Sequence, residues 1–194
     1  MTRVIGNLKE GLLFILSAPA GTGKTTLVHM LSEEFSCVKE SISCTTRAPR
    51  PSEIDGLHYH FLSEEEFKLK IKNEEFLEYA QVFGDFYGTL KKSVEEDRKK
   101  GSHVILVIDT QGAMQLKGKI KSSFIFISPP NLEELRERLQ KRKTESEEKI
   151  TKRLDWAKEE LKMAPHYDYH IVNDNLIVAY DVLRSIIIAE EHRR

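Results

Sequence analysis

The sequence lacks the features of a secreted, membrane-spanning or nucleic-acid-binding protein. Cys37 and Cys44 are its only cysteines in 194 residues, too few for a disulfide framework and without the paired Cys and His spacing of a zinc site. No apolar run is long enough to span a bilayer. Lys and Arg total 30 against 31 Asp and Glu, so the charge balance indicates no polyanion-binding surface. We therefore expect a cytoplasmic protein with no nucleic-acid partner and no membrane partner.

The most informative stretch is residues 12–26, LLFILSAPAGTGKTT, an apolar run that opens into a glycine-rich turn. Gly21 and Gly23 lack Cβ, so backbone N–H groups can turn onto a phosphate without steric cost. Lys24 then brings an ammonium to the β- and γ-phosphates, and the Thr25 hydroxyl can bind Mg²⁺. Ala18 stands where the strict G-x-x-x-x-G-K-[ST] pattern has Gly, which is a small change. The predicted phosphate-binding loop comprises Ala18, Pro19, Ala20, Gly21, Thr22, Gly23, Lys24, Thr25 and Thr26.

The N-terminus superficially resembles a signal peptide, because Arg3 and Lys9 precede GLLFIL and the sequence Ala18-Pro19-Ala20. Its apolar core is too short for that role. Cleavage after Ala20 would also cut the phosphate-binding loop in half. We therefore interpret this stretch as part of the folded protein.

Predicted strands and helices alternate along the chain, which indicates a parallel α/β sheet covered on both faces. Strands are expected near residues 12–17, 38–44, 103–109, 124–128 and 169–173, with short antiparallel strands in 76–90. Helices are expected directly after the loop and over residues 63–73, 91–100, 132–141, from 144 onward and 176–191. Capping patterns mark three helix starts, Ser63 with Glu66, Asn131, and Thr144 with Glu147. In the last helix, Val182, Leu183, Ile186 and Ile187 are expected on the buried side.

Residues 41–61 are rich in Pro and polar residues and too irregular for regular structure, as is typical of a functional loop. Within and beyond them, TTRAPRPSEIDGLHYHFL (residues 45–62) closely resembles the signature of guanylate kinases, T-T-R-x-x-R-x-x-E-x-x-G-x-x-Y-x-F. The other motifs occur in that family's order, from the phosphate-binding loop to IVND near residue 172. The resemblance implies the reaction ATP + GMP ⇌ ADP + GDP, with Mg²⁺.

The same resemblance implies one domain over residues 1–194 with three subregions. A three-layer parallel-sheet P-loop NTPase core would comprise residues 1–40, 91–130 and 164–194. A mixed α/β GMP-binding lobe would be inserted at residues 41–90. A helical lid would comprise residues 131–163.

The resemblance implies a GMP site formed by Ser43, Arg47, Arg50, Tyr59, Glu78, Tyr87 and Thr89. Planar guanidiniums bind phosphate bidentately, which suits Arg47 and Arg50. Guanine offers N–H donors at N1 and N2, and the Glu78 carboxylate would accept from them. An adenine would leave that carboxylate unpaired. Without the resemblance, Glu78 would fit better as an outward-facing strand residue.

In the lid, Arg142 and Arg153 match arginines that stabilise the charge of the transferring phosphoryl group. By composition alone, this segment is a solvated, ion-paired helix. Asp109 follows an apolar strand at the edge where parallel sheets bind ligands. Asn173 matches a residue near the adenine of ATP. With Lys24, the two arginines and Asp109 form the expected catalytic set.

Two positions depart from the family pattern. Val107 stands where an acidic residue usually helps to organise Mg²⁺ and its waters, which affects the outer shell of the metal. Lys143 stands where family lids commonly have Gly, which would stiffen the lid.

Two other functions are compatible with parts of this pattern. Guanylate-kinase-like domains of scaffold proteins bind phosphopeptides, but they typically lose the phosphate-loop Lys and competent lid arginines, which are present here as Lys24, Arg142 and Arg153. A kinase for another nucleoside monophosphate is the second alternative, and Glu78 with Ser43 favours guanine against it. We expect a monomer or a weak homo-oligomer.

Overall fold

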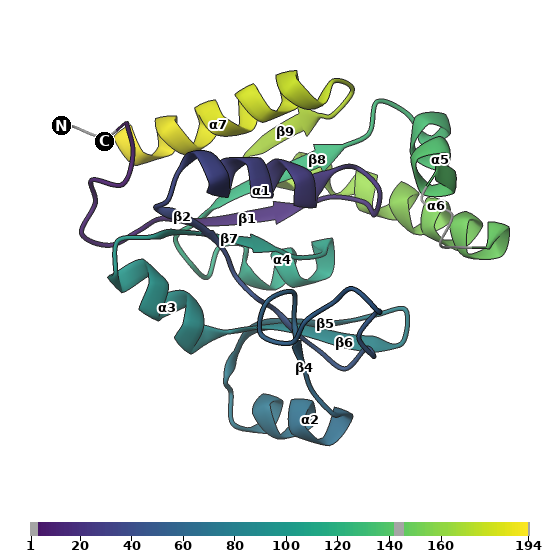
Figure 1. Ribbon diagram of the computed structural model, residues 1–194, viewed down its shortest axis with the longest axis horizontal. Helices are drawn as coiled ribbons and strands as arrows, with labels where there is room; N and C mark the ends of the chain where they lie inside the picture. Colours follow the sequence, from purple (N-terminus) through teal and green to yellow (C-terminus); the bar gives the residue numbers. More distant parts are fainter. Residues whose placement is uncertain (1–3, 142–145, 194) are drawn as a thin grey trace.

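The computed structural model describes residues 4–141 and 146–193. Figure 1 shows a layered α/β core with a second, smaller sheet beside it. The strands are β1 Leu13–Ser17, β2 Val38–Glu40, β3 Cys44–Thr45, β4 His60–Phe61, β5 Phe76–Val82, β6 Asp85–Leu90, β7 His103–Val107, β8 Ser123–Ser128 and β9 Tyr169–Val172. The helices are α1 Lys24–Glu34, α2 Glu64–Lys72, α3 Lys91–Lys99, α4 Thr110–Leu116, α5 Leu132–Lys141, α6 Glu147–Lys162, the 3₁₀ turn η1 Ala164–His166 and α7 Leu176–His192.

The core sheet is parallel throughout, with strand order β2-β7-β1-β8-β9. Every residue of the central strand β1 is buried, as the continuous apolar run predicts for a strand covered on both faces. Phe14 and Leu16 pack in one cluster with α1 and α7, whereas Leu13 and Ile15 pack in another with α3 and α4. The predicted three-layer parallel core is therefore confirmed (Figure 1).

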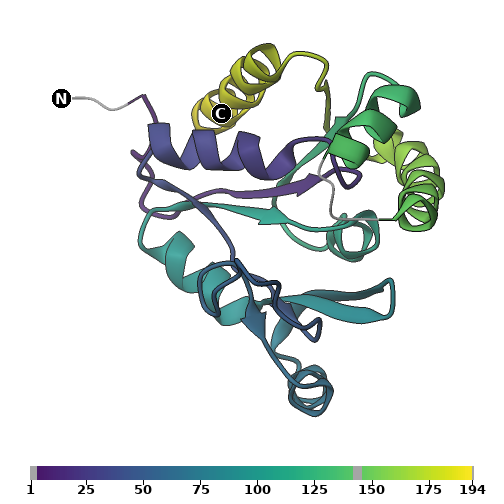
Figure 2. The same ribbon diagram turned by 45° about the vertical axis from the view of Figure 1, so that its right-hand side comes forward.

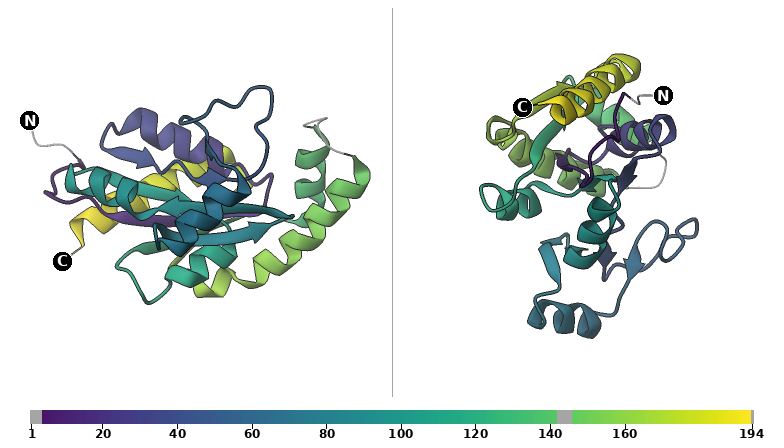
Figure 3. Two further views of the ribbon diagram at one scale, coloured as in Figure 1. Left: turned by 90° about the horizontal axis from the view of Figure 1, so that it is seen from below. Right: turned by 90° about the vertical axis from the view of Figure 1, so that its left-hand side faces the viewer.

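The second sheet has the order β4-β3-β6-β5 and is mixed. With α2 it lies below the core in Figure 1 and in the right-hand view of Figure 3. The antiparallel strands expected within 76–90 are β5 and β6. The helix expected over 63–73 is α2, where Ser63 and Glu66 form both hydrogen bonds of the predicted capping box.

The single strand expected near 38–44 is wrong, because the chain divides there between the two sheets. β2 pairs with β7 in the core, and the Ser41 N–H still donates to the Ile105 carbonyl at 2.9 Å. The chain then turns away, and Cys44 pairs with Gly88 in the second sheet. β3 and β4 also give residues 41–61 more regular structure than their composition predicts.

Helices α5 and α6 lie next to each other at the right of the molecule in Figure 2. They pack on each other through Leu135, Leu139, Ile150, Leu154 and Ala157. The Asn131 side chain accepts a hydrogen bond from the Glu134 N–H at 2.8 Å and caps α5, as predicted.

The start of α6 differs from the prediction. Its N-cap is Ser146, whose hydroxyl accepts from the Lys149 N–H, so that the helix begins at Glu147. Thr144, the predicted cap, lies outside the described residues. Helix α4 follows Asp109 and was not predicted. No described helix combines the length and the apolar content that a membrane span requires.

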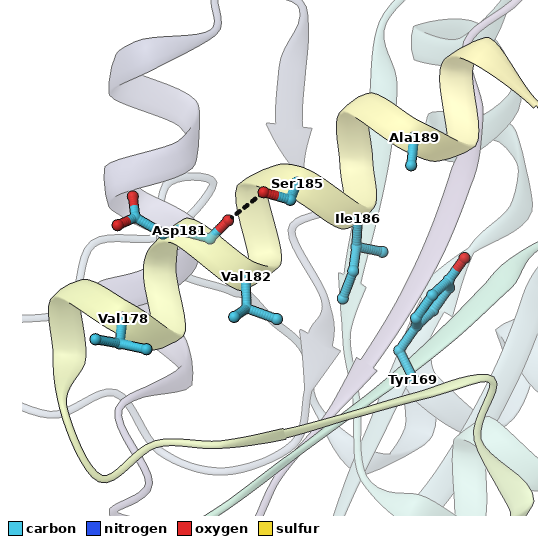
Figure 4. Close-up of a pocket in the computed structure, with 7 residues that line it drawn as sticks. All are labelled: Tyr169, Val178, Asp181, Val182, Ser185, Ile186 and Ala189. Atoms are coloured by element: carbon cyan, nitrogen blue, oxygen red, sulfur yellow. Dashed lines mark hydrogen bonds between the residues drawn. The ribbon is translucent and has the colours of Figure 1, made fainter.

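In α7, Leu183, Ile186 and Ile187 are buried as predicted, but Val182 is exposed. Val182 and Val178 face a shallow hollow between α7 and Tyr169 of β9, shown in Figure 4. The buried stripe of α7 is narrower than predicted because β9 is the last strand of the sheet and covers only part of the helix. None of the predicted site residues lines this hollow.

Candidate active site

The predicted phosphate-binding loop connects β1 to α1 and has the local geometry that its glycines allow. Gly21 and Gly23 have φ values of 96° and 91°, a region that residues with a Cβ rarely adopt. The Thr22 hydroxyl donates to the Pro19 carbonyl at 2.8 Å and closes the turn. A Cβ at Gly23 would lie 2.7 Å from the Asn173 Nδ2 atom. Glycine is therefore required at this position for space as well as for backbone conformation.

Asn173 braces this loop. It follows β9 and is buried, and its Nδ2 donates to the Thr22 carbonyl at 2.6 Å. Its own carbonyl accepts from Arg138 Nη1 of α5 at 3.0 Å. Arg138, which the sequence reasoning missed, therefore links α5 to the segment that supports the loop. The role predicted for Asn173 beside an adenine remains a prediction.

Lys24 begins α1, and its Nζ donates to the Ala18 carbonyl at 2.9 Å, so the side chain folds back across the loop. Ala18 is buried directly after β1, so its methyl group fits there and glycine is not needed for space. Thr25 and Thr26 are exposed in the first turn of the helix. Backbone N–H groups and the positive end of a helix dipole are available at such a helix start. The loop thus presents a cation, hydroxyl groups and backbone donors together.

Asp109 lies next to this loop because β7 pairs with β1 in parallel and both strands end at the same edge. The Ser17 hydroxyl donates to the Asp109 carbonyl at 3.4 Å across that edge. The Asp109 side chain caps α4, since Oδ1 accepts from the Gly112 N–H at 2.8 Å. Burial raises the pKa of the Asp109 carboxyl, and the nearby Lys24 charge opposes that shift. Val107 packs half-buried against the core and brings no carboxylate to this edge.

Glu160 of α6 is a second acidic residue near Lys24 and Asp109, and the sequence reasoning missed it. It is only 6% exposed, and burial raises its pKa to about 7. The Lys24 charge lowers that pKa and the Asp109 charge raises it, so both groups lie within electrostatic range. The signal in the sequence was a Glu three residues after Ala157, on the helical face of the buried residues Leu154 and Ala157.

Arg47 and Arg50 both contact the Glu53 carboxylate in the loop between β3 and β4. Arg47 Nη2 donates to Glu53 Oε1 at 2.9 Å, and the Arg50 N–H donates to Glu53 Oε2 at 2.8 Å. The Arg47 guanidinium also lies over the Tyr59 ring, 5.4 Å from its centroid. Tyr59 in turn contacts Tyr87 edge to face, at 6.1 Å between centroids. Glu53, part of the signature but not predicted as a site residue, holds both arginines on one side of the loop.

Glu78 lies on β5 and is buried, with 4% of the residue exposed. Its Oε1 accepts a hydrogen bond from the Thr89 hydroxyl of β6 at 2.7 Å. Burial raises the Glu78 pKa to about 7, against the lowering effect of this hydrogen bond. The structure therefore excludes the outward-facing interpretation of Glu78. Ser43 precedes β3, and its carbonyl accepts from the His60 N–H at 2.9 Å.

Helix α4 contacts β5 at this carboxylate. A Cβ at Gly112 would lie 2.3 Å from Glu78 Oε2. The Gln115 side chain donates through Nε2 to the Tyr79 carbonyl at 2.6 Å and accepts from the Tyr79 N–H at 3.4 Å. The first turn of α4 therefore joins Asp109 at the core sheet to Glu78 in the second sheet.

Arg153 lies on α6, and its guanidinium carbon is 5.8 Å from the centroid of the Phe83 ring. Arg142 and Lys143 lie outside the described residues. In Figure 1 the β1 arrow points toward the side of the molecule where α5 and α6 lie. The loop, Asp109 and the helices that carry the predicted lid residues thus share one edge of the core sheet.

A parallel sheet with a glycine-rich loop, its Lys and the half-buried carboxylate of Asp109 at the same edge defines a P-loop nucleotide-binding protein. The model of the guanylate kinase family matches residues 10–190. The chain is 57% identical over 188 residues to a guanylate kinase of Protochlamydia amoebophila (strain UWE25), covering 97% of this chain and 95% of that protein. It is 48% identical to a guanylate kinase of Desulfitobacterium hafniense (strain Y51), covering 95% and 92%.

The solved structures agree with this match. The crystal structure of guanylate kinase from Anaplasma phagocytophilum is similar with a TM-score of 0.78 and 36% sequence identity, over 95% of this chain and 88% of that one. The chain belongs to the guanylate kinase family.

Proposed function

We propose that this protein transfers the γ-phosphoryl group of ATP to GMP, giving ADP and GDP. The observation that carries the choice of guanine is Glu78, a buried carboxylate held by Thr89 in a lobe that also carries Arg47 and Arg50. Burying a carboxylate is costly unless donors satisfy it, and N1 and N2 of guanine would add donors to the one that Thr89 supplies. Lys24 favours an enzyme over a phosphopeptide-binding module, because such a module has no use for a phosphate-loop ammonium.

In this proposal, residues 41–90 form the GMP lobe, residues 131–163 the lid and the rest the core. Arg47 and Arg50 bind the GMP phosphate, with hydroxyls from Tyr59 and Tyr87. Ser43 and Thr89 contact the base beside Glu78. We further propose that the protein acts in the cytoplasm as a monomer or a weak homo-oligomer.

ATP would bind along the loop 18–26 at the α1 N-terminus, with Asn173 supporting the loop near the adenine. Thr25 would help to hold Mg²⁺ beside Lys24, and the ion would supply positive charge to the ATP phosphates. The residues present fit this ion, because the exposed Thr25 hydroxyl stands beside Lys24 and Mg²⁺ keeps much of its water shell. The described residues include no cluster of three acidic or His side chains that could enclose a metal. An ion held mainly by phosphates and water needs few protein carboxylates, which is consistent with Val107 at the position where the family usually has an acidic residue.

The chain's own residues would act by position and charge, with no covalent intermediate. Lys24 would stabilise the β- and γ-phosphate charge, and Arg153 with Arg142 would stabilise the equatorial oxygens of the transferring group. Asp109 would orient water or a cation at the edge of β7. A coupled assay of ADP formation with GMP, AMP, UMP and dTMP tests the proposal. Of these four monophosphates, we expect turnover only with GMP. Equal turnover with AMP would exclude guanine recognition.

GMP affinity should rise with pH through about 7 because the Glu78 carboxylate must be ionised to accept hydrogen bonds from guanine. The Glu78 pKa is raised to about 7, so the acid form is favoured below that pH and the binding-competent form above it. Between pH 6 and pH 8, Kd should fall about tenfold, following the competent fraction. Calorimetry across this range measures the effect.

Glu78→Gln is the matched control, because the phosphate of GMP titrates in the same way with the variant and with the wild type. It should bind GMP more weakly at pH 8, by roughly 1.5–3 kcal/mol, and lose the part of the pH dependence that belongs to Glu78. Parallel pH profiles of the two proteins would contradict the assignment.

Gly112→Ala should raise KM for GMP about tenfold and leave KM for ATP unchanged, since a Cβ there would displace the Glu78 carboxylate. Ala favours helix over Gly by about 1 kcal/mol, so a weakened α4 would not explain the loss. Steady-state kinetics with each substrate varied measure the effect. In the background of Glu78→Asp, which has a shorter side chain, Gly112→Ala should add little. Full additivity of the two changes would argue against contact between these residues as the cause.

A further inference from the structure

The turn between β5 and β6 carries an aromatic residue that its backbone does not favour. Val82 pairs with Asp85, so the turn consists of Phe83 and Gly84, with φ values of 53° and 97°. Such two-residue turns favour Asn-Gly or Asp-Gly, and a bulky residue at positive φ is uncommon. Phe83 is also 57% exposed. Neither turn geometry nor burial in the second sheet accounts for a Phe at this position.

Phe83 contacts two residues of α6. The Phe83 and Trp156 rings lie with centroids 5.5 Å apart and an interplanar angle of 52°. The Arg153 guanidinium carbon is 5.8 Å from the centroid of the same Phe83 ring. Residues 153 and 156 are three apart on the helix and so present one common face. The tip of the hairpin therefore touches that face, and Figures 1 and 2 show the β5–β6 hairpin extending toward α6.

The same hairpin carries residues of the proposed GMP site. Glu78 lies on β5 and is joined through its side chain to Thr89 on β6. Six paired positions connect the two strands, from Phe76 with Leu90 to Val82 with Asp85. A displacement of the hairpin would move the guanine-reading carboxylate and Phe83 together.

We propose that Phe83 is a positioning residue that holds the Arg153 guanidinium and thereby links the orientation of the lid arginine to the hairpin that carries Glu78. A long Arg side chain loses rotamer freedom when it is fixed, so a partner that orders it beforehand favours the transition state. The aromatic face attracts the cation, and Trp156 packs against the same Phe83 ring. This inference rests on the proposed function, because the benefit of an oriented Arg153 is realised only during phosphoryl transfer.

Phe83→Ala should lower kcat about tenfold while KM for GMP and for ATP changes less than about twofold, since the ring contacts Arg153 and Trp156 of α6, and Arg153 is expected to act in the transition state. Phe83→Tyr is the matched control, which keeps the ring and should keep kcat within about twofold of the wild type. In an Arg153→Ala background, Phe83→Ala should have no further effect on kcat if it acts through Arg153. Circular dichroism and thermal unfolding verify that each variant is folded.

Trp156 is the only tryptophan in the chain, so its fluorescence reports the contact without any assay of activity. In Phe83→Ala, acrylamide should quench Trp156 more strongly than in the wild type and in Phe83→Tyr. Quenching and kcat equal to the wild type would overturn the inference, and so would a kcat loss that adds fully to that of Arg153→Ala. Absence of GMP turnover in the wild type would instead overturn the proposed function, with quenching still reporting whether Phe83 covers Trp156.

Discussion

Lys24→Ala should lower kcat by about a thousandfold, a loss of roughly 4 kcal/mol of transition-state stabilisation. The Lys24 ammonium lies in the loop between β1 and α1, bound to the Ala18 carbonyl at 2.9 Å. Charge moves between the β- and γ-phosphates during transfer, and no other cation of the described loop residues 18–26 can stabilise it. The proposed GMP residues belong to the second sheet and its loops, so GMP affinity should stay within about twofold of the wild type.

Lys24→Met keeps most of the aliphatic stem without the charge and should lose as much activity as Lys24→Ala. Lys39→Ala is the control for removal of a Lys. Lys39 Nζ lies 2.6 Å from Asp97 Oδ1, and this ion pair is not part of the loop. Calorimetry with GMP and steady-state rates with saturating ATP measure the two effects separately. If GMP affinity fell together with kcat, the division into a GMP lobe and an ATP-binding core would be wrong.

The parts of the site that depend on local sequence could be predicted. The loop conformation follows from Gly21 and Gly23 at positive φ, and the strand before it follows from a continuous apolar run. The capping box at Ser63 and the β5–β6 hairpin are also local features. In each case the residues that determine the structure lie within a few positions of one another, so no tertiary contact was needed to recognise them.

The parts that depend on tertiary contacts could not be predicted. The brace from Asn173 to Thr22 joins residues 151 positions apart. The residues 38–44 divide between two sheets because their pairing partners, β7 and β6, belong to different sheets. Helix α4 is short and begins directly after its N-cap Asp109, which was assigned to chemistry and not recognised as a cap. Spacing in the sequence carries no information on such partners until the fold brings them together.

Asp109 caps helix α4, and its charge is proposed to act in the site; Asp109→Asn separates these two roles. Asn caps helices about as well as Asp, and its Oδ1 can still accept from the Gly112 N–H, which now lies 2.8 Å from Asp109 Oδ1. The substitution therefore removes the charge and keeps α4. If the carboxylate acts on Mg²⁺-bound water or on a phosphate-binding cation, kcat should fall about a hundredfold with little change in thermal stability. A Mg²⁺ titration of the rate, with thermal unfolding of the same samples, measures both effects.

Asp109→Ala is the complementary variant, because it removes the cap as well as the charge. It should unfold at a lower temperature, by a loss of about 1 kcal/mol, yet lose no more activity than Asp109→Asn. The two measurements distinguish the roles. Thermal stability should fall only when the cap is lost, in Asp109→Ala, whereas kcat should fall in both variants because both lose the charge. A folded and fully active Asp109→Asn, beside an impaired Asp109→Ala, would mean that Asp109 supports the site only through α4. In that case Glu160, which lies within electrostatic range of Lys24, would be a further carboxylate to test at this edge.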